Sequence, residues 1–167
     1  MSAKQNVVVI GGGGAGAAIA RGLLQKIDTS LYQITVINSR PFEVFYPPLV
    51  RAVVTAEGRI EDDIFNPLSK IFPNGIQVKV GTVARIEHSG DKDHSGKVIL
   101  ESNEEIEFVA LVITPGSKWE GPLALPESRE DIDKHLASWR ARFKAAKSVV
   151  IAGGGPVGIG ELSCTVM

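Results

Sequence analysis

The feature that most constrains the fold of this chain is a cluster of glycines that directly follows a short apolar run. The run, residues 7–10, is β-branched throughout and is typical of a strand buried on both faces of a parallel sheet. Behind the glycines, apolar residues recur at helical spacing over 15–26, and a second β-branched run follows at 34–37. This order of strand, glycine turn, helix and strand predicts a βαβ unit.

The glycines match the spacing of a dinucleotide-binding turn, Gly11-x-Gly13-x-x-Gly16. The first glycine permits a tight turn, the second lets the backbone approach a pyrophosphate, and the third lets helix and strand pack closely. Free N–H groups at the start of the helix, together with the helix dipole, stabilise the negative charge. The pattern therefore predicts a dinucleotide site. The alternative is a glycine-rich turn that binds nothing.

The end of the second predicted strand departs from the usual dinucleotide site. The acidic residue expected there, which accepts hydrogen bonds from the adenosine ribose, is replaced by Asn38. An amide oxygen also accepts such a bond, but without the charge that strengthens it, so we expect weaker binding. Ser39 and Arg40 follow and are candidate cofactor-binding residues, because an arginine at this place can accommodate a 2′-phosphate.

The middle of the chain predicts a small antiparallel meander, and the end repeats the opening motif. Short strand-like runs separated by polar turns place the meander at about residues 76–108. Residues 130–147 have the pattern of an amphipathic helix. The apolar run 149–152 then leads into Gly153-x-Gly155-x-x-Gly158. Two such motifs in one chain predict two dinucleotide sites.

These elements predict an α/β fold. Residues 1–147 form a Rossmann-like domain with an inserted antiparallel β-meander, and residues 148–167 contain the first strand of a second, truncated Rossmann domain. No side chain stands out as a catalytic acid, base or nucleophile, which suits a protein whose cofactor carries the chemistry.

The motifs together resemble a known family. In chain order they are VVVIGGGGAGAAIA, ITVINSR, YPPLVRAVV, VGTVARI, LVITPGS and VVIAGGGPVG. They resemble the N-terminal half of the apoptosis-inducing-factor-2-like and ferroptosis-suppressor-like NAD(P)H:quinone oxidoreductases and, more loosely, of type II NADH dehydrogenases. The resemblance implies FAD as the cofactor, NAD(P)H as the hydride donor and a quinone-like small molecule as the electron acceptor. It disfavours a 2′-phosphate at Ser39 and Arg40, since FAD has none.

The resemblance also implies roles for individual residues. The first glycine motif would bind the FAD pyrophosphate, with Gly12, Gly14 and Ala15 as backbone neighbours of its three glycines. The second motif, Gly153, Gly155 and Gly158, would bind NAD(P)H. Further FAD contacts would come from Arg51, Val83, Thr114 and Gly116. Pro115 stands where the family has a threonine, so a donor and a hydroxyl are missing there.

The family pattern stops shortly after Gly158. We therefore expect a truncated N-terminal half that lacks most of the NAD(P)H-binding domain. The alternative is a non-catalytic FAD-binding or interaction fragment that self-associates through the apolar run 149–152, because an unpaired apolar strand is a pairing site.

Composition excludes several other functions. Lys and Arg number 18 against 19 Asp and Glu, so the chain lacks the positive excess that nucleic-acid binding needs. The three histidines have no metal-ligand spacing, and a single cysteine, Cys164, can form neither an intrachain disulfide nor a cysteine metal cluster. No apolar run approaches the length of a transmembrane helix, and no signal peptide is recognisable. We expect a cytoplasmic or mitochondrion-associated protein that is not secreted.

Overall fold

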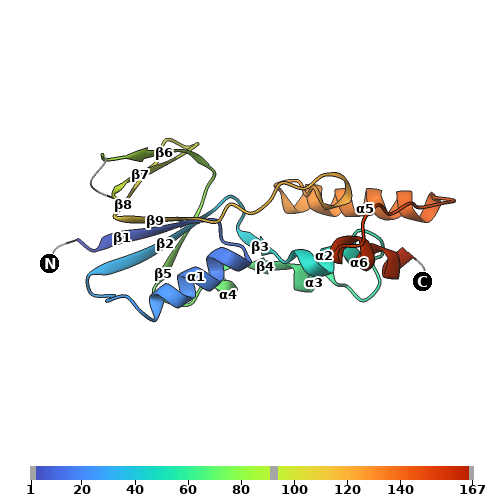
Figure 1. Ribbon diagram of the computed structural model, residues 1–167, viewed down its shortest axis with the longest axis horizontal. Helices are drawn as coiled ribbons and strands as arrows, with labels where there is room; N and C mark the ends of the chain where they lie inside the picture. The colour runs from blue at the N-terminus through green and yellow to red at the C-terminus, as the bar shows by residue number, and fades with distance from the viewer. Residues whose placement is uncertain (1–2, 91–93, 166–167) are drawn as a thin grey trace. The chain divides into compact units, whose positions relative to one another are not determined.

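The computed structural model describes the backbone of residues 3–90 and 94–165 and the side chains up to residue 160 (Figure 1). Cys164 and part of the predicted polar turn at 91–96 therefore lie outside the described side chains. The chain forms two compact units. Unit 1 consists of Met1–Glu43 and Pro67–Gly116, and unit 2 consists of Val44–Asn66 and Ser117–Met167. This geometric division does not test the predicted boundary between two nucleotide-binding domains at residue 148.

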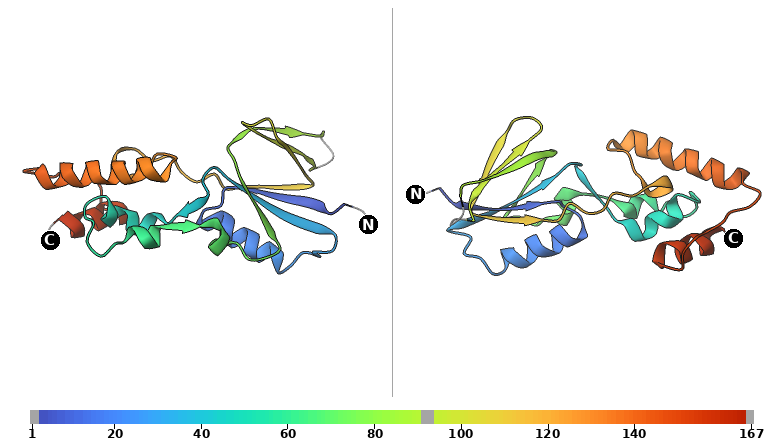
Figure 2. Two further views of the ribbon diagram at one scale, coloured as in Figure 1. Left: turned by 180° about the vertical axis from the view of Figure 1, so that it is seen from behind. Right: turned by 45° about the horizontal axis from the view of Figure 1, so that its top comes forward.

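Unit 1 is built on a parallel sheet of four strands in the order β5 (Ile76–Val80), β2 (Tyr32–Asn38), β1 (Gln5–Ile10) and β9 (Ala110–Ile113). All three strand pairs are parallel. Helix α1 (Gly14–Leu24) connects β1 to β2 and covers one face of the sheet (Figures 1 and 2). The predicted βαβ unit is therefore confirmed.

The other face of the sheet is covered by an antiparallel meander of β6 (Val83–His88), β7 (Gly96–Leu100) and β8 (Glu105–Phe108). Because neighbouring residues of a strand point to opposite faces, Val9 packs on the helix side and Val8 on the meander side. Both are fully buried. The continuous apolar runs of β1 and β2 thus supply two cores, and the predicted α/β fold with an inserted meander is confirmed.

The meander is smaller than the sequence predicts. Residues 76–80 pair with β2 in parallel, with Ile76 opposite Ile34, and so belong to the main sheet. Ile76 is buried in the helix-side core with Phe72, which follows the short helix α4 (Leu68–Ile71). The rest of β5 is largely exposed, as expected for an edge strand.

Unit 2 is mainly helical. Its elements are α2 (Tyr46–Ala52), α3 (Glu61–Ile64), the 3₁₀ turn η1 (Gly121–Leu123), α5 (Arg129–Ala145) and α6 (Pro156–Thr165). The short strands β3 (Phe42–Val44) and β4 (Phe65–Pro67) pair where the chain passes between the units. The core of unit 2 includes Leu49, Val53, Ile64, Ile132 and Leu136. No helix among the described residues is long and apolar enough to cross a membrane.

Helix α5 begins one residue before the predicted start and ends two residues before the predicted end. Ser128 caps it by accepting a hydrogen bond from the backbone N–H of Asp131, and Glu130 and Asp131 place negative charge in the first turn. Basic side chains occupy the last turn, where they complement the helix dipole.

The run 149–152 forms no strand, in contrast to the prediction. A strand of a parallel sheet needs a neighbouring strand for its hydrogen bonds, and the described residues of unit 2 offer none to this run. Val150 is accordingly 89% exposed. The run leads through the second glycine motif into α6.

Candidate functional site

The junction of β1 and α1 requires glycine at two positions, one in the turn and one in the first turn of the helix. Gly11 has a φ of +99°, and a Cβ atom there would lie 2.0 Å from the carbonyl oxygen of Thr114. At Gly16 a Cβ atom would lie 1.8 Å from the carbonyl oxygen of Gly11. The first glycine therefore makes the turn and the third lets α1 pack on it, as the motif predicts.

The second glycine of the motif faces open space. A Cβ atom at Gly13 or Gly14 would meet no atom within 4 Å. Gly13 is the N-cap residue of α1, and it offers no side chain to bind the first N–H groups of the helix. The first turn also contains no acidic residue. The start of α1 is thus open to an anionic group, which the backbone N–H groups and the helix dipole would stabilise.

Asn38, at the end of β2, binds the glycine turn directly. Its Oδ1 accepts a hydrogen bond of 2.9 Å from the backbone N–H of Gly12. Its Nδ2 donates to the carbonyl oxygens of Arg40 at 2.8 Å and Phe42 at 3.4 Å. The amide oxygen that we expected to face the ribose is therefore engaged within the protein.

Thr114, which follows β9, binds the glycine turn from the opposite side. Its hydroxyl lies 2.9 Å from the carbonyl oxygen of Ile10 and 3.2 Å from that of Gly11, and its N–H also donates to Ile10. The hydroxyl therefore points toward the glycine turn and is hydrogen-bonded to its backbone. Gly116 has a φ of +80° and no neighbour within 4 Å of a Cβ position.

The predicted FAD contacts fall in both units. Unit 1 holds the glycine turn, Asn38, the exposed Ser39, the half-buried Arg40 and the Thr114–Gly116 segment at the carboxyl ends of its parallel strands. Val83 is half-buried and packs against the meander-side core. Arg51 lies in α2 of unit 2 and is half-buried.

The second glycine motif, in unit 2, repeats the local geometry of the first. Gly153 has a φ of +120°, and a Cβ atom at Gly158 would lie 2.3 Å from the Gly153 carbonyl oxygen. The N–H of Ile159 donates to Gly155, just as the N–H of Ala17 donates to Gly13. A cavity of about 520 Å³ adjoins this turn and is lined partly by Phe143, Ile151 and Gly154. The turn therefore forms although the run 149–152 before it is not a strand.

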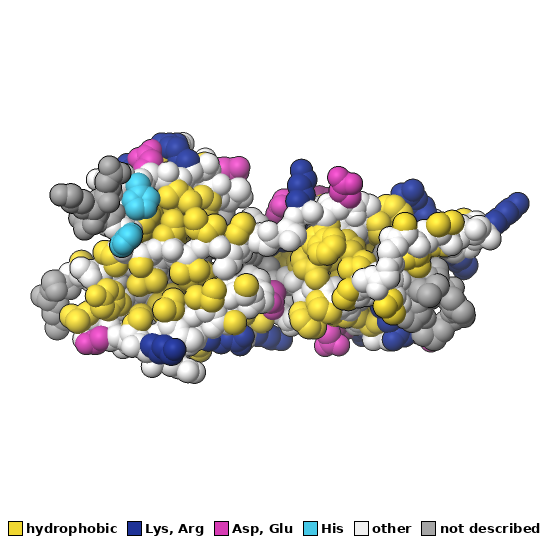
Figure 3. All heavy atoms as spheres, in the orientation of Figure 1, with side chains coloured by type: hydrophobic (Ala, Val, Ile, Leu, Met, Phe, Trp, Pro, Cys, Tyr) yellow, Lys and Arg dark blue, Asp and Glu magenta, His cyan; other side chains and the backbone are white. Residues whose placement is uncertain are grey.

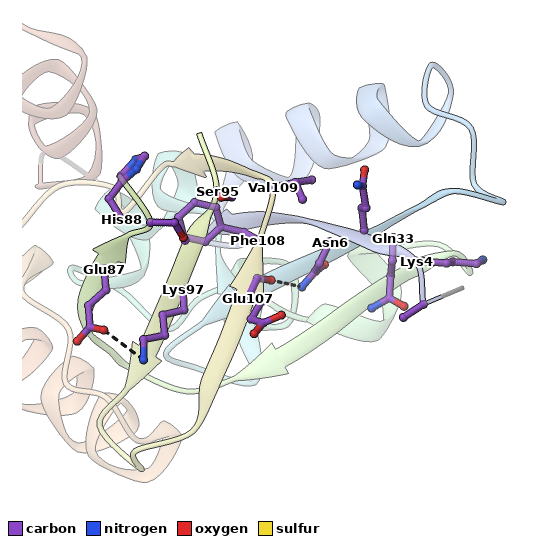
Figure 4. A pocket seen from close by; sticks show the side chains of 14 residues that line it. Lys4, Asn6, Gln33, Glu87, His88, Ser95, Lys97, Glu107, Phe108 and Val109 are labelled. Atoms are coloured by element: carbon purple, nitrogen blue, oxygen red, sulfur yellow. Dashed lines mark hydrogen bonds and ion pairs between the residues drawn. The ribbon is translucent and has the colours of Figure 1, made fainter. Parts of the chain in front are cut away.

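Unit 1 also contains a larger cavity, of about 930 Å³, that sequence reasoning missed (Figure 4). It lies at the amino ends of the strands. Lys4, just before β1, and Asn6, in β1, line it on one side, and Lys97 and Phe108 of the meander line it on the other. The pKa of Lys97 is raised by hydrogen bonds to Glu105 and Glu87. Ligands of open α/β sheets bind at the carboxyl ends of the strands, so the glycine turn is the stronger candidate site.

The histidines form no metal site with other described residues. No group of three or more His, Cys, Asp or Glu side chains in the described part of the chain is placed to hold a metal ion. His88 and His94 are exposed, and Figure 3 shows histidine side chains on the surface over the meander. His135 lies on α5, with its Nε2 at 2.9 Å from the carbonyl oxygen of Pro122.

Comparison with known proteins gives consistent matches. The sequence pattern of the pyridine nucleotide-disulphide oxidoreductase family matches residues 5–166. The FAD-dependent oxidoreductase FVFD30 of Flammulina velutipes is 41% identical over 115 residues, which cover 66% of this chain and 34% of that protein. Apoptosis-inducing factor homolog B of Dictyostelium discoideum is 32% identical, with 93% of this chain and 37% of that protein covered. Oxidoreductase phnG of Penicillium herquei is 30% identical, with 96% and 42% covered.

Solved structures with the same fold are more distant in sequence. The covalent putidaredoxin reductase–putidaredoxin complex matches with a TM-score of 0.61 at 20% identity, covering 99% of this chain and 40% of that chain. The sulfide:quinone oxidoreductase of Aquifex aeolicus matches with a TM-score of 0.57 at 23% identity, covering 84% and 33%. The chain thus spans less than half the length of the relatives it matches.

Proposed function

The chain belongs to the pyridine nucleotide-disulphide oxidoreductase family, whose members use FAD and NAD(P)H, and we propose that its first glycine motif binds the pyrophosphate of FAD. The observation that carries this proposal is the open start of α1. Gly13 and Gly14 leave space for a ligand, and no side chain among the described residues caps the helix N-terminus. Gly11 and Gly16 pack closely against neighbouring backbone atoms, which fixes the turn. The N–H groups at the start of α1 would therefore be oriented toward an anion before it binds.

For the whole protein we propose an NAD(P)H oxidoreductase of the apoptosis-inducing-factor-2-like type, with a quinone-like electron acceptor. When bound, FAD would supply the redox chemistry between NAD(P)H and the acceptor. The residues of this chain would bind and orient the two nucleotides at the two glycine turns. The likeness to apoptosis-inducing factor homologues supports this proposal.

The first test is the visible absorption spectrum of the purified 167-residue chain, before and after anaerobic NADH and then dithionite. We expect flavin bands near stoichiometric yield. Bleaching by NADH would show that this chain also transfers hydride, whereas bleaching by dithionite alone would show an FAD-binding module without its hydride donor. Absence of bands, after refolding with excess FAD, would contradict the proposed site.

A Gly13→Val variant tests the same site by mutation. Gly13 has an extended backbone with φ of −75°, which a β-branched residue can adopt, and a Cβ atom there would meet no atom within 4 Å. The new side chain occupies the space through which a pyrophosphate approaches the backbone. We expect FAD affinity to fall at least about tenfold, whereas stability in urea should fall only by the roughly 1 kcal/mol that a valine at the N-cap costs. Unchanged affinity, measured by flavin fluorescence titration, would place FAD elsewhere.

We also propose that residues 149–152 mediate self-association of this chain, because Val150 is 89% exposed and the run lacks charge. A Val150→Lys variant is expected to shift the chain toward monomer, as measured by sedimentation velocity. Leu31→Lys is the matched control, since Leu31 is an apolar residue of unit 1 that is also exposed, at 56%. An equal shift in both variants, or none, would contradict a role for this run.

A further inference from the structure

The amide of Asn38 joins two separate turns of unit 1. On one side its oxygen accepts from Gly12 in the glycine turn after β1. On the other side its nitrogen donates to Arg40 and Phe42, which lie in the turn after β2 and at the start of β3. The side chain therefore needs an acceptor and a donor at the same time, which a neutral amide provides.

An ionised carboxylate cannot replace this amide without changing the structure. Its two oxygens are acceptors only. One of them could still accept from Gly12, but the other would then lie against the carbonyl oxygen of Arg40, which the amide nitrogen now approaches to 2.8 Å. Two acceptors at that distance repel each other. The acidic residue usual at this place therefore conflicts with the turn that this chain forms.

The close packing of Gly12 supports the same conclusion. Gly12 is buried, and a Cβ atom there would lie 3.3 Å from both Cβ and Cγ of Asn38. The Gly12 N–H points at Asn38 and is not available to a ligand. Thr114 holds the preceding carbonyl oxygens from the other neighbouring strand. The glycine turn is thus fixed from both sides, and Gly13 and Gly14 remain open.

We propose that Asn38 is a positioning residue that holds the glycine turn in its binding conformation through a neutral amide, and that it does not contact the adenosine ribose. This inference rests on the proposed FAD site. It deepens that proposal by assigning recognition of the ribose to other groups and by restricting the pyrophosphate contacts of the turn to the N–H groups beyond Gly12.

An Asn38→Asp variant separates this role from ribose binding, because the two roles predict opposite results. If Asn38 held the ribose, a carboxylate would strengthen the contact and FAD would bind more tightly near pH 7.5. If Asn38 positions the turn, we expect FAD to bind at least about tenfold more weakly to the variant at about pH 7.5. The measurement is a fluorescence titration of FAD with both chains.

The pH dependence of this variant provides the second readout. A protonated carboxyl has one donor and one acceptor, so it can restore both bonds of the amide. The ratio of FAD affinities between the variant and the original chain should therefore recover as the pH falls from about 7.5 to about 5. A ratio that stays constant over this range would overturn the proposal, as would tighter binding at the higher pH.

Two further measurements complete the test. The first compares the affinities for ADP and 2′-deoxy-ADP, measured by competition with FAD. The ratio of these two affinities should be the same for the original chain and for Asn38→Ala. If the ratio fell to about one only in the variant, Asn38 would contact the ribose.

Hydrogen exchange at the Gly12 amide is the second measurement and needs no nucleotide. We expect this exchange to be at least about tenfold faster in Asn38→Ala. Unchanged exchange would overturn the positioning role even if the chain bound no FAD. Faster exchange in a chain without FAD binding would instead contradict only the proposed FAD site.

Discussion

A Gly16→Ala substitution is expected to destabilise unit 1 by about 3 kcal/mol and to abolish FAD binding at micromolar concentrations. The added methyl group would lie 1.8 Å from the carbonyl oxygen of Gly11, a backbone atom that cannot rotate away. Moving that carbonyl would disturb the N–H bond from Gly11 to Ile37 and the contact with the Thr114 hydroxyl. Urea unfolding, followed by far-UV circular dichroism, measures the loss of stability. Titration with flavin measures the loss of binding.

Gly22→Ala is the matched control for this prediction. Gly22 lies in the same helix, and its Cβ position has no neighbour within 4 Å. Alanine there should stabilise the chain by about 0.5–1 kcal/mol, because glycine loses more conformational freedom on folding. FAD affinity should be unchanged. If Gly16→Ala were as well tolerated as Gly22→Ala, the packing of α1 on the glycine turn would not have the role assigned to it.

The parts of the fold that the sequence predicts are those in which local pattern and tertiary environment agree. The β-branched runs of β1 and β2 are continuous because both faces of these strands are covered, by α1 on one side and by the meander on the other. The strand β5 lies at the sheet edge, and only Ile76 is buried there. Its alternation of apolar and polar residues is that of a half-exposed strand, so the sequence places it in the meander.

The same limit applies to the candidate site. The roles of Gly11 and Gly16 follow from spacing, because their constraint is local backbone geometry. The hydrogen bonds of Asn38 and Thr114 join residues that lie 26 and 103 positions apart in the chain. The strand order of the sheet brings both residues beside the glycine turn. The directions of their side chains depend on turns whose conformation the sequence does not reveal. From the sequence alone, a residue that supports the glycine turn cannot be distinguished from one that contacts a ligand.

An Arg140→Met substitution is expected to destabilise unit 2 by about 2–3 kcal/mol. Arg140, on α5, donates to the carbonyl oxygen of Ala52 at 2.7 Å and pairs with the carboxylate of Glu61 on α3. The side chains of Arg140 and Glu61 are only 20% and 18% exposed. Methionine fills a similar volume but removes the hydrogen bonds that Arg140 donates to both acceptors. Glu61→Gln is the milder comparison, at about 1 kcal/mol, since it removes the charge and keeps a hydrogen-bond acceptor.

The pH dependence of stability distinguishes the ion pair from a packing effect. Burial raises the pKa of Glu61, but hydrogen bonds from its own backbone N–H and from Arg140, with the charge of that guanidinium, outweigh burial and leave the pKa below its ordinary value. A carboxyl with a lowered folded pKa stabilises the fold above its unfolded pKa of about 4.3 and loses this contribution as the pH falls through the folded value. The stability difference between the original chain and Glu61→Gln, measured by urea unfolding, should therefore be largest above about pH 5 and shrink in acid. A difference that is independent of pH would show that Glu61 acts through packing alone.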